Sequence, residues 1–430
     1  MKIENMISII ILFGIISCSK PEIIPPIIDK PNCSFGLCDT SKLEIVWQKP
    51  LSYDTSERFS AYPLLHENSI LFSRSTFGEQ WDTLKSFDQK TGQLKWTWAD
   101  YFSNGELRTY KIYLEKGKYI FNAGNDIFVV DATNGKTLWK TKLLRGGSSA
   151  SINIQYDHIY MQHLDESSTK NLASYLVRSN ISYGKWDTLF TENRRENSIP
   201  IGMQSPTIWI SPQKDTIALF QIRFVDYGDP LKSKVDFVAY NITQKNEYFR
   251  YDNIDKLRGG STKLPFLIGN LVYVAFTKSI YCFDLIEKKI KWSKDMSPGE
   301  NFSSGQPFIF VENQFFVKPT NRSLYQIDPN TGAEIWSDKD NGSGNSDMVY
   351  DNGILYYTGD GVGKIFALEV ATKKWLWAEP SPNKFPNAFN GNRRFGNANI
   401  GSGGIAIDAK NGYLYTSDFY FAMCLKLPKR

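Results

Sequence analysis

An acidic residue, a glycine four places later and a tryptophan eight places later recur along this chain, and this repeat constrains the fold more than any other feature. The clearest copies run from Asp88 to Trp96, from Asp131 to Trp139 and from Asp328 to Trp336. Weaker copies keep the eight-residue step, and they run from Arg178 to Trp186, from Asn241 to Phe249, from Asp284 to Trp292 and from Glu369 to Trp377. Supersecondary units that recur along a chain in this way bury their apolar faces only against neighbouring units.

The residues between the copies predict strands. Apolar and polar residues alternate with a period of two residues, as between Lys118 and Asp131, whereas helical repeats would show a period of 3.6 residues. The glycine allows a positive φ in a tight hairpin, and the acidic side chain can accept backbone N–H groups across it. Each unit therefore reads as two strands, the acidic turn and a last strand that carries the aromatic ring, which is typical of a four-stranded propeller blade.

Both ends of the chain fit a closed ring. Trp47 belongs to a strand with no blade before it, while the strands at 411–417 and 420–426 have no tryptophan strand after them. We predict an all-β, eight-bladed β-propeller of four-stranded antiparallel blades, in which the N-terminal strand joins the C-terminal blade and leaves no long unpaired edge. The aromatic anchors expected to pack between blades are Trp47, Trp96, Trp139, Trp186, Phe249, Trp292, Trp336 and Trp377. Cys282 and Cys424 fall where a small core residue precedes the turn, and we expect them to act as small apolar fillers.

The N-terminus predicts export and a lipid anchor. Residues 1–17 contain an apolar run that is too short to span a bilayer and is typical of a signal peptide. The run ends at Cys18, the position of the acylated cysteine in a bacterial lipoprotein, and a proline-rich stem covers residues 18–42 before the propeller at 43–430. The alternative is an ordinary cleaved signal with an incidental cysteine. Cys33 and Cys38 are close enough in sequence for a disulfide in the stem.

Composition argues against several functions. The chain has 50 Lys and Arg against 45 Asp and Glu, and a formal net charge of +5 is too dilute for nucleic acid to be an expected partner. Three histidines, with no CxxC pair and no HExxH motif, give no expected metal site. No GxSxG elbow or phosphate-binding loop is present either, so we assign no catalytic residue.

The turn pattern of a small residue, an apolar residue, Asp, then Gly and Trp resembles the repeat of the pyrroloquinoline-quinone-type, or PQQ-like, propellers over residues 43–430. With eight blades on a lipidated stem, the chain resembles the BamB-like outer-membrane lipoproteins. This resemblance implies a non-catalytic binding or scaffolding role at the bacterial outer membrane, in outer-membrane protein assembly, with a periplasmic or surface-facing position. Ser19 after Cys18 resembles the outer-membrane sorting signal of better-known lipoproteins.

Two alternatives follow from the same resemblance. Quinone dehydrogenases of this fold are implied to need a vicinal cysteine pair over the cofactor and a calcium ion held by Glu, Asn and Asp. This chain has no adjacent cysteines, so we expect no quinone, no calcium and no enzyme activity, and a quinone-dependent dehydrogenase is the weaker alternative. A surface receptor for glycans or peptides is the other alternative.

Arginines occur in the segments that should join an outermost strand to the next innermost strand. The planar guanidinium suits carboxylates, phosphates and sugar acids. We therefore predict a protein- or glycan-binding surface on one face of a monomeric propeller, with Arg58, Arg108, Arg145, Arg258, Arg393, Arg394, Phe389 and Phe395 as its candidate residues. Solvated loops with scattered arginines are the alternative interpretation of the same segments.

Overall fold

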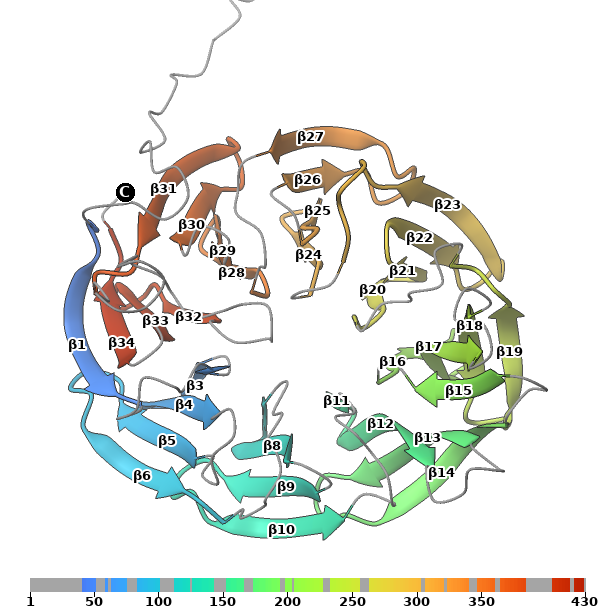
Figure 1. The fold of residues 1–430 in the computed structure, drawn as a ribbon, viewed down its shortest axis with the longest axis horizontal. Helices are drawn as coiled ribbons and strands as arrows, with labels where there is room; N and C mark the ends of the chain where they lie inside the picture. Colours follow the sequence, from blue (N-terminus) through green and yellow to red (C-terminus); the bar gives the residue numbers. More distant parts are fainter. Residues whose placement is uncertain are drawn as a thin grey trace, which may run out of the picture.

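A computed structural model gives the fold of the chain. It describes residues 41–51, 59–60, 63–75, 83–100, 112–123, 126–142, 152–165, 173–193, 198–202, 205–226, 233–255, 263–302, 306–320, 323–339, 346–359, 364–383, 404–417 and 421–428. Every regular element in this part of the chain is a β-strand. The strands form eight antiparallel sheets that stand as blades around a central axis (Figure 1).

The chain builds the blades in order, each from its innermost to its outermost strand. Blade 1 contains β2 (Phe59–Ser60), β3 (Leu64–His66), β4 (Ser69–Ser75), β5 (Thr83–Asp88) and β6 (Leu94–Trp98). Blade 2 contains β7 (Tyr113–Glu115), β8 (Lys118–Ala123), β9 (Asp126–Asp131) and β10 (Thr137–Lys142), and blade 3 contains β11 (Ile152–Gln155), β12 (His158–Asp165), β13 (Ala173–Asn180) and β14 (Trp186–Asn193). Blade 4 contains β15 (Ser198–Gly202), β16 (Thr207–Ile210), β17 (Thr216–Asp226), β18 (Lys234–Asn241) and β19 (Asn246–Tyr251).

The second half repeats the plan. Blade 5 contains β20 (Phe266–Ile268), β21 (Leu271–Ala275), β22 (Ser279–Asp284) and β23 (Lys289–Asp295), and blade 6 contains β24 (Phe308–Val311), β25 (Gln314–Val317), β26 (Ser323–Ile327) and β27 (Glu334–Lys339). Blade 7 contains β28 (Val349–Asp351), β29 (Ile354–Gly359), β30 (Lys364–Glu369) and β31 (Lys374–Pro380). Blade 8 contains β32 (Ile405–Asp408), β33 (Tyr413–Ser417), β34 (Phe421–Lys426) and, as its outermost strand, β1 (Glu44–Pro50). In blades 1 and 4 two short strands share the innermost position, because both pair with the same second strand.

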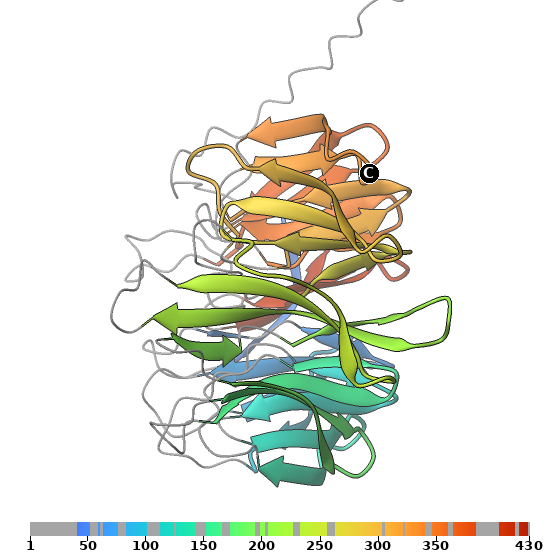
Figure 2. The same cartoon turned by 90° about the vertical axis from the view of Figure 1, so that its right-hand side faces the viewer.

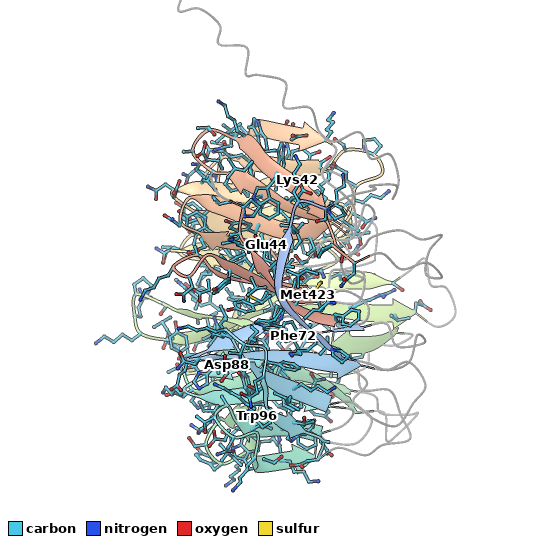
Figure 3. All side chains as sticks on the ribbon, turned by 90° about the vertical axis from the view of Figure 1, so that its left-hand side faces the viewer. Lys42, Glu44, Phe72, Asp88, Trp96 and Met423 are labelled. Atoms are coloured by element: carbon cyan, nitrogen blue, oxygen red, sulfur yellow. The ribbon has the colours of Figure 1, made fainter. Side chains whose placement is uncertain are left out.

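The N-terminal strand closes the ring. β1 pairs antiparallel with β34, and Trp47 lies opposite Cys424. Figure 3 shows β1 beside Met423 on the outside of the ring, with Lys42 and Glu44 at its start. The residues before β1 also bind blade 7, since the Ser41 hydroxyl donates to the Pro380 carbonyl at 2.8 Å and the Lys42 amide donates to Glu379 Oε2 at 3.0 Å. The prediction of eight blades closed by the first strand is confirmed.

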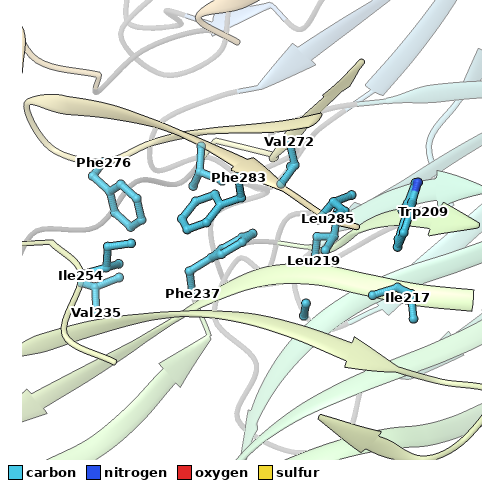
Figure 4. Packing of buried hydrophobic residues seen from close by; sticks show 12 residues of the cluster. Trp209, Ile217, Leu219, Val235, Phe237, Ile254, Val272, Phe276, Phe283 and Leu285 are labelled. Carbon is cyan, nitrogen blue, oxygen red and sulfur yellow. The ribbon is translucent and has the colours of Figure 1, made fainter. Parts of the chain in front are cut away.

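The apolar core is divided among the blade interfaces. Each of eight buried clusters takes residues from two consecutive blades, and blade 8 shares clusters with blades 7 and 1. In the cluster between blades 4 and 5 (Figure 4), the rings of Phe237 and Phe283 stack with their centroids 4.4 Å apart. A blade is therefore stabilised mainly by its two neighbours, as in other repeat proteins.

The tryptophan of one blade packs on the turn glycine of the next. A Cβ added at Gly135 would lie 2.5 Å from Cε3 of Trp96, and one at Gly92 would lie 2.6 Å from Cδ2 of Trp47. Gly184 has the same relation to Trp139, and Gly332 to Trp292. These glycines have φ between +67° and +73°, so both the backbone and the contact with the indole favour glycine.

A shared backbone carbonyl completes two of these contacts. The Trp47 indole N–H donates to the Gln89 carbonyl at 2.8 Å, and the Tyr415 hydroxyl from the same blade donates to that carbonyl at 3.3 Å. Trp292 and Tyr273 of blade 5 donate in the same way to the Pro329 carbonyl of blade 6, at 2.9 and 3.0 Å. The acidic turn thus receives hydrogen bonds from the preceding blade as well as its ring.

Within the turn, the acidic side chain binds local donors. Asp131 Oδ1 accepts the Thr133 amide at 2.8 Å and the Thr133 hydroxyl at 2.6 Å. The hydrogen bond from the Thr133 side chain is the main reason that the pKa of Asp131 is below its ordinary value. The turn therefore holds an ionised carboxylate that the backbone itself stabilises.

Blade 3 departs from the predicted register. Asn180, not Arg178, occupies the acidic position of its turn, because the Asn180 side chain accepts the Ser182 amide and its carbonyl accepts the Gly184 amide. The β-bulge of the outermost strand lies further along, which places Phe190 opposite Leu176 and Trp186 opposite Ser179. Phe190 then packs between blades 3 and 4, whereas Trp186 packs with Trp139 between blades 2 and 3. The predicted turn residue was therefore two positions too early, and the predicted ring residue, Trp186, lies four residues before Phe190, which holds the ring position.

The two cysteines in the described part of the chain are buried in the blade cores. Cys282 lies opposite Trp292 and Cys424 lies opposite Trp47. Burial raises the pKa of each thiol to about 12, so both are protonated at neutral pH.

We predict that Gly135→Ala lowers the free energy of unfolding by about 3 kcal/mol, because it adds a backbone cost at positive φ and a Cβ inside the ring of Trp96. Gly412→Ala is the matched control, since Gly412 has φ +75° but no atom within 4 Å of an added Cβ. It should cost only the backbone term, about 1 kcal/mol. Urea titrations of both variants measure the difference, and equal losses would show that the indole contact contributes nothing.

Candidate functional site

The two faces of the ring differ in how the chain crosses them. The hairpin between the first two strands of a blade and the acidic turn before its last strand lie on one side, which we call the turn face. The segments that join the second strand of a blade to its third, and those that join one blade to the next, begin and end on the opposite side. We call this side the connection face. The short described turns gather at the right of Figure 2, where the blades are seen from the side.

The sequence predicts eight candidate residues for a binding surface on the connection face. Arg58, Arg108, Arg145, Arg258, Arg393, Arg394, Phe389 and Phe395 all lie outside the described residues, as do Cys18, Cys33 and Cys38. The structure instead shows the ends of the strands that frame this face, and three polar clusters lie there or beside it.

The first cluster is a ring of buried positions on the second strand of every blade, near the connection face. Its members, which we call the polar ring, are Ser73, Asn122, Gln162, Gln221, Ala275, Lys318, Thr358 and Ser417. Seven of these eight positions are polar, and none is more than 4% exposed.

Members of the polar ring bind the next blade. Gln162 Nε2 donates to the Gln221 carbonyl at 3.0 Å, and Gln221 Nε2 donates to the Ala275 carbonyl at 3.1 Å. Hydrogen bonds therefore join blades 3, 4 and 5 at this level, where the deeper levels have apolar side chains. We did not predict this ring, although a polar residue in the same place of seven of the eight second strands is a visible signal.

Lys318 is the basic member of the polar ring and is 2% exposed. Its ammonium group donates to the Ser323 carbonyl at 3.2 Å and lies 5.5 Å from the ring centroid of Tyr357. Burial lowers the pKa of Lys318 to about 7, and the carboxylates of Glu300 and Asp338 oppose this shift. A lysine with this pKa changes its charge near neutrality.

The side chains around Lys318 are also buried. Glu300 accepts the Tyr325 hydroxyl at 2.7 Å and the Ser297 amide at 3.2 Å. The hydroxyl of Tyr357 is buried and has no hydrogen-bond partner, and burial raises its pKa well above the ordinary value. This cluster joins blades 6 and 7 around a lysine whose pKa lies close to neutral pH.

We predict that Lys318→Met stabilises the protein more at pH 6 than at pH 10. The pKa of Lys318 is lower in the folded chain than in the unfolded chain, so the unfolded state binds more protons between about pH 7 and the ordinary lysine pKa. The stability of the native sequence therefore rises with pH across this window, and the full penalty is present below pH 7. Thermal unfolding at several pH values tests this, with exposed Lys339→Met in the same blade as the control. A pH-independent difference between Lys318→Met and the native chain would contradict it.

The second cluster is an arginine with several carboxylates between blades 3 and 4. Arg250 donates from Nε and Nη2 to Asp236 Oδ2 at 3.1 and 2.6 Å, and from Nη1 to Glu192 Oε2 at 2.8 Å. The Asp236 side chain is 0% exposed and that of Arg250 is 13% exposed. Asp236 also accepts the Asn253 amide at 2.8 Å, so these charges are bound to the fold from several sides.

We predict that Arg250→Met lowers the free energy of unfolding by about 3 to 5 kcal/mol, because it leaves the buried Asp236 carboxylate without its cation. The double variant Arg250→Met, Asp236→Leu should recover part of this loss, since it also removes the buried charge. Urea titration of both variants provides the measurement. A double variant that is no more stable than the single variant would show that the ion pair is not the source of the loss.

The described residues offer little for metal chemistry or for crossing a membrane with a helix. They contain no group of three or more His, Cys, Asp and Glu side chains that could hold a metal ion. In the same part of the chain, no helix has the length and apolar character needed to cross a bilayer. The third polar feature, Arg223, is considered below.

The closed ring of eight four-stranded blades, with acidic turns in five of them, defines a PQQ-like β-propeller. The family model described as outer membrane protein assembly factor BamB matches residues 37–168 and 320–414, more than half of the chain. The chain belongs to this family. A search of curated proteins finds no match to the chain.

Solved structures share the fold at low sequence identity. The crystal structure of BamB from Moraxella catarrhalis is 12% identical with a TM-score of 0.50, and the match covers 90% of this chain and 98% of that one. The quinohemoprotein alcohol dehydrogenase ADHIIG from Pseudomonas putida is 11% identical with a TM-score of 0.59, covering 90% of this chain and 76% of that one. The computationally designed Ika8 protein is 11% identical with a TM-score of 0.57, covering 86% of this chain and 96% of that one. At these identities the likeness shows the fold alone.

The residues present do not fit the quinone cofactor of the dehydrogenase branch. The sequence has no adjacent cysteines, and Cys282 and Cys424 are buried in the cores of blades 5 and 8. The cysteine pair that the resemblance assigns to such enzymes therefore has no counterpart here, and we derive no reaction through a quinone.

Proposed function

We propose that the chain is a non-catalytic, lipid-anchored scaffold that acts in protein assembly at the bacterial outer membrane. The observation that carries this proposal is the family match, because it covers more than half of the chain and both halves of the ring. The propeller supplies the rigid part of a scaffold, since each blade is held by apolar clusters and hydrogen bonds to its neighbours.

The proposed domain plan places the anchor before the ring. Residues 1–17 are removed as a signal peptide, Cys18 is acylated, and the stem at 18–42 links the lipid to the propeller at 43–430. The last residues of the stem region bind blade 7 through Ser41 and Lys42. Force on the stem is therefore transmitted to the closing strand and to two blades.

The partner surface in this proposal is the connection face. The long segments of a propeller carry variable chemistry on a rigid support, and the predicted arginines lie in those segments. A guanidinium rim suits carboxylate-bearing protein partners, while sugar acids would fit it in the glycan-receptor alternative.

Crosslinking in native membranes tests the proposal. We expect the native chain to capture outer-membrane assembly proteins and the triple variant Arg145→Ala, Arg258→Ala, Arg393→Ala to capture at least tenfold less. The control variant Lys90→Ala, Lys136→Ala, Lys288→Ala removes the same charge from the turn face and should capture normally. Equal capture by both triple variants would contradict the assignment of the connection face. Capture of cell-surface glycans instead of assembly proteins would favour the receptor.

A further inference from the structure

Arg223 differs from the other arginines whose side chains the structure describes. Arg250 is paired with Asp236 and Glu192, and Arg178 with Asp187 at 3.4 Å. The Nε atoms of Arg223 and Arg178 are both buried without a hydrogen-bond partner, but Arg178 has an ion pair through Nη2, whereas Arg223 has no ion pair among the described residues. A buried donor without an acceptor costs about 1 to 3 kcal/mol, so its presence needs an explanation.

The register of β17 gives the direction of this side chain. Arg223 pairs with Val235 in a stretch of β17 and β18 without a bulge. Ile222 and Phe224 on either side belong to the cluster between blades 3 and 4, whereas Leu219 and Val235 belong to the cluster between blades 4 and 5. Because successive side chains of a strand alternate, Arg223 faces blade 5.

The residues beside Arg223 are apolar on the side away from the connection face and polar on the side toward it. Val235 lies near Ile254 and Phe276 in Figure 4, and the Ile254 amide donates to the Val235 carbonyl at 2.8 Å. The next residues toward the connection face are Asp255 and Thr277, whose side chains are hydrogen-bonded to each other at 3.0 Å. Arg223 is also two residues beyond Gln221 of the polar ring, and therefore nearer to the connection face.

The chemistry of the free edge selects the ligand. An arginine that offers Nε and Nη2 side by side can bind one planar oxyanion through two hydrogen bonds, as Arg250 does with Asp236 in this blade. The apolar side chains of Val235, Ile254 and Phe276 are suited to contact the methylene groups that carry a carboxylate.

We propose that Arg223 binds the carboxylate of an acidic ligand at the connection face between blades 4 and 5. The carboxylate belongs either to an acidic side chain of a polypeptide or to a free carboxylic acid. The site shares only the connection face with the scaffold proposal, and a binding assay on the purified chain tests it without any membrane partner.

The test uses fluorescence anisotropy of a labelled hexaglutamate peptide with the purified full chain at low ionic strength. We expect Arg223→Gln to weaken binding at least tenfold, because it removes two charge-assisted hydrogen bonds. Arg223→Lys should give an intermediate affinity, since the ammonium keeps the charge but not the paired donors. Lys278→Gln, which removes an exposed charge in blade 5, should change the affinity less than about twofold.

Competition identifies the source of the carboxylate. Displacement of the peptide by succinate would indicate a site for free carboxylic acids, whereas resistance to succinate would indicate a polypeptide ligand; both results support the site. Equal affinities for Arg223→Gln and the native chain, or equal binding of hexaglutamine and hexaglutamate, would overturn it. Thermal unfolding checks that each variant is folded, and the intermediate behaviour of Arg223→Lys separates lost binding from lost structure.

Discussion

The contact of an indole with the turn glycine of the following blade joins four of the eight neighbouring blade pairs and is the most specific interaction between blades. It determines the residue at both ends of the contact, because a side chain on the glycine would overlap the ring and because the turn needs a positive φ. The chain itself supports this interpretation. Where the preceding ring is phenylalanine, as at Phe190 and Phe249, lysines occupy the turn position in the left-handed region, Lys245 with φ 58° and Lys288 with φ 54°. Lys373, which follows Trp336, keeps the positive φ without the glycine.

Contacts of this kind act only between neighbours, so the ring must solve a problem at its ends. An open array would leave the apolar face of its first and last blades in water. β1 removes both faces together, since Trp47 belongs to the cluster with blade 1 while its strand completes blade 8. Ser41 and Lys42 extend the closure to blade 7, so the N-terminal segment connects three consecutive blades. Losing this segment would therefore expose two blade interfaces.

The sequence was sufficient to predict the blade count, the strand order and the closure, because a local pattern occurs seven times and the two ends of the chain supply the parts of an eighth blade. It was insufficient where one blade departs from the pattern. In blade 3 the eight-residue step from Arg178 to Trp186 is a coincidence of spacing, and only the strand pairing shows that Phe190 holds the ring position. Arg223 was missed for a different reason. It lies inside a strand, and nothing in a single sequence shows that its Nε is buried without an acceptor while the guanidinium of Arg250 is surrounded by carboxylates.

The buried polar residues near the connection face raise the question of how the fold offsets the cost of their burial. An apolar side chain at Lys318 would avoid the cost of burying an amine, and most of the buried side chains that join the blades below this level are apolar. Gln162 and Gln221 offset their burial through hydrogen bonds to the next blade, and Asp236 does so through Arg250. The buried Nε of Arg223 has no hydrogen-bond partner, and Arg223 and Lys318 both lie toward the connection face. Local costs that neither packing nor hydrogen bonding offsets are expected where a surface has been selected for binding rather than for stability. This expectation favours the connection face over the turn face as the binding surface of the propeller.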